Sequence, residues 1–293
     1  MAEAPPGLVA TPLHSLFNHS AHEGLSVPPF TPEENYARVE GMESRDDDVL
    51  ICTFSKSGTT WLQNMVYHLL GCPAGPITQL DRQVPWLQAI PDADMAAAMP
   101  SPRVFKTHDL YSWLPEQWRT RKLIYCYRNA KDWALSYFNH IQALQKFYYC
   151  PITDFDTYFT EIARKREVCE FGLWEDHVIE WLGHMGDENI LFLTYEDLSE
   201  DTGRELARIA EFLGVELTDE LRERVLSEGK FEKMQGNDAV NYSWLVDIEK
   251  TPMIRKGKVG GWQGQLSVDQ EAELDVAIEK VRAAGGKIRC TLE

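Results

Sequence analysis

A segment of small residues and one lysine, Ser55-Lys56-Ser57-Gly58-Thr59-Thr60, joins an apolar run to a helical pattern. A strand, a tight turn and a helix start expose backbone N–H groups at the positive end of a helix dipole. Gly58 allows close backbone approach, the hydroxyl groups donate hydrogen bonds and Lys56 adds charge. The segment therefore predicts a phosphate-binding loop. It is not a Walker A motif, in which the lysine follows the last glycine.

Further cationic groups and one histidine follow other apolar runs. Lys106 and His108 are two positions apart in a short strand pattern, so both side chains point to the same face. A histidine there can act as a general base near neutral pH. Arg128 ends another strand pattern, and Ser136 lies two turns into the next helix. With the basic cluster Arg255-Lys256-Gly257, they can hold a second phosphate.

The elements that must position these residues alternate along the chain. Apolar runs typical of strands buried on both faces occupy residues 49–54, 103–108, 122–127 and 189–195. Helical spacing occupies residues 59–70, 130–146, 171–184, 201–213 and 268–284. This alternation predicts one α/β domain with a central parallel sheet and helices on both faces. Ligands of such sheets bind at the carboxyl ends of the strands, where the polar and cationic residues lie.

Charge and composition exclude some classes of partner. The chain has 293 residues, 29 Lys+Arg against 46 Asp+Glu, and a formal net charge of −17. Nucleic-acid and anionic-membrane binders are basic, so neither partner is expected. A few cations in one cleft can still hold a small anion, and the net charge can steer a small cationic ligand. No run approaches the roughly 18–20 apolar residues of a membrane span.

The N-terminal residues and the cysteines indicate the cellular compartment. The first basic residue is Arg38, so neither a secretory signal nor a transit peptide is expected. Six cysteines without a CxxC pair are expected to be reduced, which predicts a cytoplasmic protein. Residues 1–30 predict an irregular N-terminal arm, and residues 31–293 the domain. Residues 228–262 have little periodicity and predict a long functional loop or lid.

Five segments together resemble one known family, the cytosolic sulfotransferases, which transfer a sulfonate group from 3′-phosphoadenosine 5′-phosphosulfate (PAPS) to an acceptor. Residues 53–61 are similar to the family's T-Y-P-K-S-G-T-T-W loop, and residues 105–108 to its K-T-H segment. Residues 127–137 are similar to R-N-x-K-D-x-x-x-S-Y, residues 195–198 to Y-E-D, and residues 255–262 to R-K-G-x-x-G-x-W. The five segments have the family's order and spacing, over residues 46–284.

The resemblance implies a role for each matching residue. The P-loop-like 5′-phosphosulfate loop would consist of Lys56, Ser57, Gly58, Thr59 and Thr60. The 3′-phosphate site would consist of Arg128, Ser136, Arg255, Lys256 and Gly257. Trp61 and Phe231 would sandwich the adenine, with Tyr195 at its edge. His108 would be the catalytic base, Lys56 would stabilise the leaving oxygen and Lys106 the sulfonate. The product would be 3′-phosphoadenosine 5′-phosphate (PAP), and no metal is required.

Three segments depart from the family pattern. Ser55 replaces a proline, which gives the loop more freedom. Lys230 stands where the family often has a hydroxyl residue, and it either contacts the nucleotide or points to solvent. The family's dimer motif, K-x-x-x-T-V-x-x-x-E, aligns with residues 263–272, where Gln263 and Ala272 replace both charged residues. We therefore expect a monomer or a homodimer that does not use this motif.

The acceptor is expected to be a small molecule that offers a hydroxyl or an amine. Residues at matching places of the acceptor pocket are Trp86, Phe147, Tyr242, Trp244 and Ile248. Leu144 occupies the region where the catecholamine-selective form has a carboxylate. Two alternatives stay open: a PAPS- or PAP-binding protein without catalysis, and a P-loop nucleotide kinase.

Overall fold

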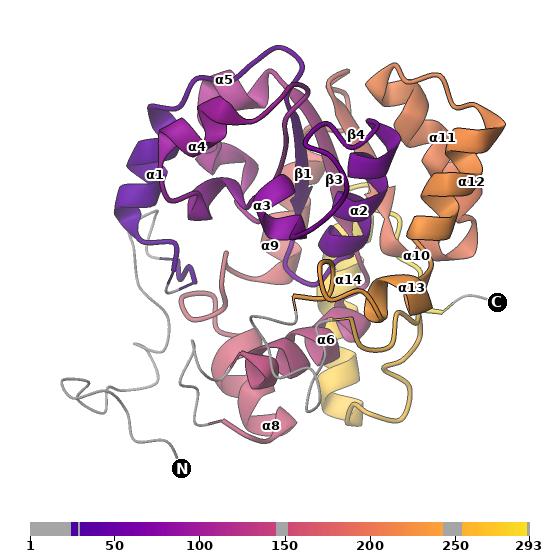
Figure 1. The fold of residues 1–293 in the computed structure, drawn as a ribbon. Coiled ribbons are helices and arrows are strands. Elements are labelled where there is room, and N and C mark those ends of the chain that lie inside the picture. The colour runs from indigo at the N-terminus through magenta and orange to yellow at the C-terminus, as the bar shows by residue number, and fades with distance from the viewer. Residues whose placement is uncertain (1–24, 29, 145–151, 243–253, 292–293) are drawn as a thin grey trace.

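Four parallel strands form the centre of the computed structural model, which describes residues 25–28, 30–144, 152–242 and 254–291. The strands are β1 (Val49–Thr53), β2 (Val104–Thr107), β3 (Lys122–Tyr127) and β4 (Ile190–Thr194), in the order β2-β1-β3-β4. Val49 lies beside both Val104 and Lys122 in the ladder. All four carboxyl ends therefore meet at one edge (Figure 1). The predicted single α/β domain with a parallel sheet is confirmed.

Helices cover both faces of this sheet, because the strands present apolar side chains on both faces. Val49 and Ile51 of β1 pack toward α2 (Thr59–Leu69), α11 (Thr202–Leu213) and α12 (Asp219–Glu228). Leu50 and Cys52 pack toward α6 (Ala130–Ala143), α9 (Trp174–Leu182) and α14 (Val268–Ala283). Figure 1 shows α11 and α12 side by side, away from α6 and α14.

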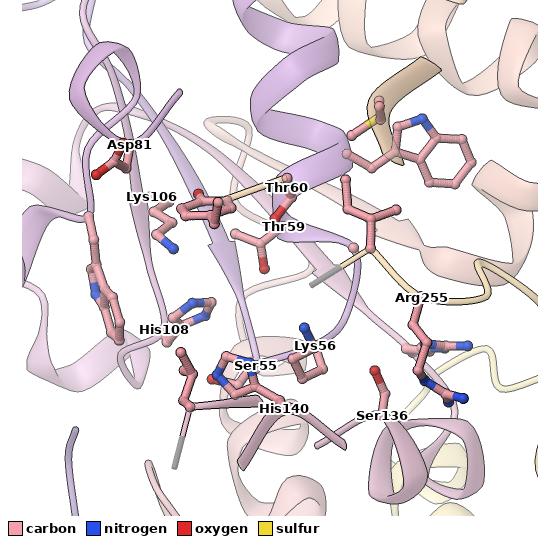
Figure 2. Close-up of a pocket in the computed structure, with 18 of the residues that line it drawn as sticks. Ser55, Lys56, Thr59, Thr60, Asp81, Lys106, His108, Ser136, His140 and Arg255 are labelled. Carbon is pink, nitrogen blue, oxygen red and sulfur yellow. The ribbon is translucent and has the colours of Figure 1, made fainter. Parts of the chain in front are cut away.

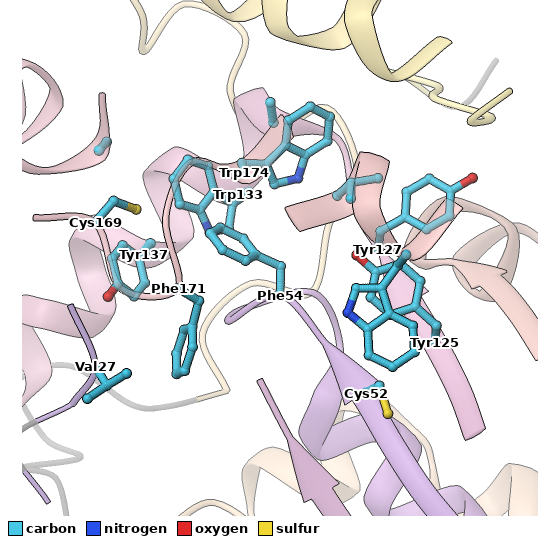
Figure 3. Close-up of a cluster of buried hydrophobic side chains, with 14 of the residues drawn as sticks. Val27, Cys52, Phe54, Tyr125, Tyr127, Trp133, Tyr137, Cys169, Phe171 and Trp174 are labelled. Carbon is cyan, nitrogen blue, oxygen red and sulfur yellow. The ribbon is translucent and has the colours of Figure 1, made fainter. Parts of the chain in front are cut away.

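The larger of the two cores is rich in aromatic rings. Tyr125 of β3 stacks on Trp181 of α9, with ring centroids 4.6 Å apart, and Phe54 packs against Trp133 of α6 at 5.2 Å. All four side chains are buried, and Figure 3 shows Phe54, Tyr125 and Trp133 among the buried rings. Because Phe54 immediately precedes the predicted phosphate-binding loop, this packing fixes the start of that loop.

Several elements differ from the sequence prediction. Tyr195 was expected to end a strand, but it begins the short helix α10 (Tyr195–Glu200), which Thr194 caps. The helix predicted from residue 171 begins at Trp174, because Phe171 and Gly172 have positive φ angles of 64° and 80°. In the described part of the region 228–262, α13 (Phe231–Gln235) follows the end of α12, and residues 243–253 lie outside the described part of the chain.

The remaining elements are short. The α-helices are α1 (Glu33–Glu40), α3 (Leu80–Gln83), α4 (Ala93–Ala98), α5 (Glu116–Arg119) and α8 (Phe155–Tyr158). The 3₁₀ turns are η2 (Leu87–Ala89) and η3 (Tyr111–Trp113), and a π-helical turn, η4, spans Phe159–Ala163. None of them exceeds eight residues, so they are too short to carry a clear helical period.

Most of the predicted N-terminal arm, residues 1–24, lies outside the described residues. Of the part that follows, Leu25 and Val27 are buried, and Ser26 forms a parallel bridge with Glu170. Among the described residues, no helix has the length and apolar character needed to cross a bilayer. The five cysteines in the described ranges are all free.

Candidate active site

One cavity of about 1380 Å³ opens at the carboxyl ends of the strands. It brings together nearly all the residues predicted to bind the nucleotide or to act in catalysis. Those that line it are Lys56, Gly58, Thr59, Thr60, Trp61, Lys106, His108, Arg128, Ser136, Tyr195, Phe231, Arg255, Lys256 and Gly257. Ser57 is the exception: it is fully buried within the loop and does not line the cavity, and its Oγ has no hydrogen-bond partner in the described structure.

The loop after β1 adopts a conformation that only particular residues tolerate. Gly58 has a φ of +98° and is the N-cap of α2. A Cβ atom at this position would lie 2.9 Å from Cδ2 of Tyr195, so a side chain there would collide with the ring. Lys56 also has a positive φ, of 66°, which is strained for a residue with a side chain. The turn directs the N-terminus of α2 into the cavity, as an anion-binding loop requires.

Lys56 and Lys106 share the cavity, and each has a lowered pKa. Burial, followed by the charges of Lys106, Arg128 and Arg255, lowers the pKa of Lys56 to about 7. Burial lowers the pKa of Lys106 to about 8, and the charge of Asp81 opposes that shift. Such clustered cations repel one another until an anion binds between them. The electrostatics therefore favour a polyanionic ligand.

His108 is oriented by the end of strand β1. Its Nδ1 lies 2.8 Å from the carbonyl oxygen of Thr53, which can only accept, so Nδ1 carries the proton. The lone pair is therefore on Nε2, in a side chain that lines the cavity. Burial, then the charge of Lys106, holds the pKa of His108 well below its usual value, so the imidazole is neutral at pH 7. A neutral histidine with a free lone pair can accept a proton.

His177 of α9 supports the same stretch of backbone. Its Nε2 lies 3.1 Å from the carbonyl oxygens of both His108 and Asp109, and its Nδ1 lies 3.1 Å from the Tyr125 hydroxyl. Burial lowers the pKa of His177 to about 4. This support was not predicted, because nothing in the local sequence distinguishes His177 from a core residue.

Arg128 is held at the start of α6 by groups from distant segments. Its Nη2 donates to the carbonyl oxygen of Lys258 at 2.7 Å, and its guanidinium lies 4.3 Å from the ring centroid of Tyr195. Glu196 accepts from the N–H and the side chain of the neighbouring Asn129, at 3.1 and 2.9 Å. Arg128 Nε is buried without a partner in the described structure. That donor is available for a phosphate oxygen.

The segment that carries Arg255, Lys256 and Gly257 is tied to the same helix. Asp132 of α6 accepts hydrogen bonds from the backbone N–H groups of Gly260 at 2.8 Å and Trp262 at 3.1 Å. Gly257 has a φ of +60°, and a Cβ atom there would lie 2.5 Å from Cδ2 of Phe231. The glycine thus lets the segment close onto that ring.

The predicted adenine site contains three aromatic rings from three elements. Trp61 of α2 and Tyr195 of α10 meet edge to face, with ring centroids 5.8 Å apart. Phe231 begins α13 and packs against Gly257. All three line the cavity, as a stacking site for a planar base needs.

The predicted acceptor pocket is described only in part. Trp86 and Tyr242 line the cavity, as does Leu144, whereas Phe147, Trp244 and Ile248 lie outside the described residues. Sequence reasoning missed several polar wall residues, which are Asp81, Arg82, His140, Glu170 and Lys258. Asp81 and Glu170 come from segments without a recognisable motif. His140 lies one turn after Ser136, a spacing that signals a shared helix face.

The labelled side chains of the cavity form two groups in Figure 2. Lys106, His108 and Asp81 lie together on one side, and Ser136 and Arg255 lie on the other. Lys230 is exposed and does not line the cavity, so the structure favours solvent for this side chain. Within the described ranges, no group of three or more His, Cys, Asp or Glu residues could hold a metal ion.

Comparisons with known proteins agree with this geometry. The family model described as "Sulfotransferase domain" matches residues 46–286. "Cytosolic sulfotransferase 1" of Danio rerio is 35% identical over 284 residues, which cover 91% of this chain and 93% of that protein.

Two solved structures share the fold. The mouse sulfotransferase SULT7A1 complexed with PAP has a TM-score of 0.74 and 25% identity, covering 91% of this chain and 98% of that one. A retinol dehydratase in a complex with retinol and PAP has a TM-score of 0.73 and 25% identity, covering 86% and 85%.

Proposed function

The chain belongs to the sulfotransferase family and transfers a sulfonate group from PAPS to an acceptor, and from this premise we propose that His108 is the general base of that transfer. Bound PAPS supplies the sulfonate group, and the leaving group is the 5′-phosphate of PAP. The acceptor is a small molecule with a hydroxyl or amine group. This assignment makes the enzyme a transferase of the EC 2.8.2 type.

The orientation of His108 is the observation that carries the proposal. The Thr53 carbonyl holds the proton on Nδ1, so Nε2 receives the proton of the acceptor. Its low pKa keeps the imidazole unprotonated at neutral pH, and a base must be free before it can act. Lys56 stabilises the negative charge that develops on the leaving oxygen, and Lys106 neutralises the sulfonate.

The donor residues suit a nucleotide with two phosphate groups. Lys56, Ser57, Gly58, Thr59 and Thr60 hold the 5′-phosphosulfate. Arg128, Ser136, Arg255, Lys256 and Gly257 hold the 3′-phosphate. Trp61, Phe231 and Tyr195 hold the adenine. The unpartnered Arg128 Nε supports this fit, since it is a buried donor of a cavity-lining residue and has no acceptor in the described structure.

Replacement of the base tests the proposal. His108→Ala should lower kcat about 10²- to 10⁴-fold, the usual contribution of general-base catalysis. The dissociation constant of PAP, measured by calorimetry, should change less than about twofold, because no phosphate contact is lost. His184→Ala removes a histidine outside the cavity, where it pairs with Asp187, and serves as the matched control. Full activity in His108→Ala would assign the proton transfer to another group.

The proposal also covers the type of acceptor, the oligomeric state and the cellular location. Trp86 and Tyr242 form an aromatic wall, which suits an acceptor with an apolar body, and a related retinol dehydratase is described with retinol bound. The enzyme is cytoplasmic, like the Danio rerio relative named as cytosolic. It acts as a monomer, or as a homodimer that does not use residues 263–272, and its net charge of −17 disfavours nucleic-acid and anionic-membrane partners.

A further inference from the structure

The loop of residues 255–262 carries Arg255 and Lys256 of the proposed 3′-phosphate site. It belongs to no helix or strand, and every one of its residues is at least partly exposed. The carbonyl oxygen of Lys258, in the same loop, accepts the hydrogen bond that holds Arg128, at 2.7 Å. A loop without a hydrogen-bonded ladder keeps one position only through individual contacts. The contacts of this loop therefore decide the geometry of the whole 3′-phosphate site.

One such contact is made with a segment near the end of the described chain. Trp262 Nε1 donates a hydrogen bond to the carbonyl oxygen of Cys290 at 2.8 Å. Gly260 packs against the same segment, since a Cβ atom there would lie 3.7 Å from that oxygen. We call residues 287–291 the strap. They follow the stretch that matches the family model, residues 46–286, so that match assigns them no role.

The first half of the strap is fixed to the sheet and to α14. The backbone N–H of Lys287 donates to the hydroxyl of Tyr127, in β3, at 2.9 Å. Ile288 is buried in the larger core, and its carbonyl oxygen accepts from Arg282 of α14 at 2.8 Å. The backbone that presents the Cys290 carbonyl to the loop thus starts from a rigid support.

The side chain of Arg289 fixes the strap to helix α10, which begins with Tyr195 of the proposed adenine site. Its Nη1 donates to Glu200 at 2.8 Å, and its Nη2 donates to Asp197 at 2.5 Å. Helix α10 is anchored independently, because Leu198 is fully buried in the smaller core. The strap therefore transmits the position of a fixed helix to an exposed loop.

These contacts connect the sheet and α10 to the 3′-phosphate site through one continuous segment. We propose that the strap positions the loop of residues 255–262, and so strengthens the binding of nucleotides that carry a 3′-phosphate. Arg289 and Trp262 are positioning residues, since neither lines the cavity. Holding the loop in place before binding reduces the ordering cost of binding. This inference rests on the proposed function and names what sets the affinity of the same site.

Two nucleotides that differ in one phosphate test the role of Arg289: PAP, and 5′-AMP, which lacks the 3′-phosphate. Arg289→Ala should raise the dissociation constant of PAP about three- to tenfold, because both ion pairs to α10 are lost. The value for 5′-AMP should change less than about twofold, and Arg289→Lys should restore most of the PAP affinity. Arg204→Ala removes an arginine of α11 that lies beside the same two carboxylates. This control loses an equal charge outside the strap and should bind PAP normally.

Trp262→Phe tests the other end of the connection. The phenyl ring still offers a face to Lys131, whose Nζ lies 4.4 Å from the tryptophan ring centroid, but the N–H donor to Cys290 is lost. The dissociation constant of PAP should rise about fivefold, with 5′-AMP unaffected. Because both changes release the same loop, the double variant with Arg289→Ala should lose less than the product of the two single losses.

Calorimetry on the free enzyme gives all these constants without turnover, so the outcomes separate the strap from the catalytic proposal. A wild-type preference for PAP that persists in both variants would overturn the role of the strap. Equal losses for the two nucleotides would also overturn it, since general destabilisation has that effect. Wild-type enzyme that binds both nucleotides equally would contradict the proposed 3′-phosphate site, and the strap with it. A strap-dependent preference for PAP without sulfonate transfer would support the strap and contradict only the proposed chemistry.

Discussion

The carboxylate of Asp132 accepts a hydrogen bond from the backbone N–H of Trp262, 130 positions later in the chain. The same carboxylate also accepts from the N–H of Gly260, so helix α6 holds the segment that follows Arg255, Lys256 and Gly257. The two parts of the proposed 3′-phosphate site are therefore joined before any nucleotide binds. The ordering cost of binding is reduced by this contact.

Removal of this contact should weaken nucleotide binding. We expect Asp132→Ala to raise the dissociation constant of PAP about tenfold, because the loss of two hydrogen bonds of about 1 kcal/mol each loosens the segment. Calorimetric titration with PAP measures the effect. Asp275→Ala removes a carboxylate that pairs with Lys131 near this segment and should have little effect. An unchanged PAP affinity in Asp132→Ala would mean that the segment is held by other contacts.

The affinity for PAP should depend on pH through Lys56. Burial and neighbouring cations lower its pKa to about 7 in the free enzyme, and a bound phosphate raises that pKa. Below pH 7 Lys56 is already protonated. Above pH 7 binding must take up a proton, so PAP affinity should fall, by up to about tenfold per pH unit between pH 7 and 9.

Lys56→Arg is the matched variant for this measurement, since a guanidinium stays charged over the whole range. Its PAP affinity should show a much smaller pH dependence than the wild type. Equal slopes in both proteins would assign the titration to Lys106, whose pKa is about 8, or to another group.

Gly257→Ala should weaken nucleotide binding for a steric reason. The added Cβ would lie 2.5 Å from Phe231, so the ring would have to move from its place in the adenine site. We expect the dissociation constant of PAP to rise at least about tenfold, or about 1.4 kcal/mol. Gly264→Ala also places an alanine at positive φ but meets nothing within 4 Å, and it controls for backbone strain alone. Similar losses in the two variants would rule out the clash as the cause.

A buried ion pair joins the residues that immediately precede β1 and β2. Arg103 and Asp48 form two hydrogen bonds, of 2.7 and 2.5 Å, and both side chains are almost inaccessible to solvent. Asp48→Ala leaves a buried guanidinium without its partner and should lower the free energy of unfolding by about 3–5 kcal/mol. Urea denaturation measures this loss. Asp46→Ala breaks the pair of a fully exposed carboxylate with Arg121 and should leave the free energy of unfolding nearly unchanged.

The strands and the nucleotide residues could be predicted because their sequence signals are local. Continuous apolar runs placed all four strands to within about two residues, and the residue types at their carboxyl ends placed Lys56, Lys106, His108 and Arg128 in one site. Because the strands are parallel, their carboxyl ends lie at a common edge of the sheet, and these residues lie there with them.

The missed features depend on distant packing. Helix α12 buries only Val225 fully, so its pattern carries almost no apolar periodicity. Asp81, in a four-residue helix, enters the cavity only through the packing of that turn beside Trp86 and Lys106. Asp132 was part of a motif, but it accepts hydrogen bonds from Gly260 and Trp262, which are 128 and 130 positions away in the chain. No local pattern in either segment predicts contacts over such a separation.

The contact between Thr53 and His108 has a mechanical consequence. Thr53 is the last residue of β1, and the chain reaches Lys56 three residues later. The imidazole and the lysine are therefore attached to the same end of one central strand, which is paired on both sides. A thermal displacement of that strand moves both groups together, so their separation fluctuates less than the position of either one. The rigidity of the sheet thus helps to maintain the alignment between the proton acceptor and the leaving group.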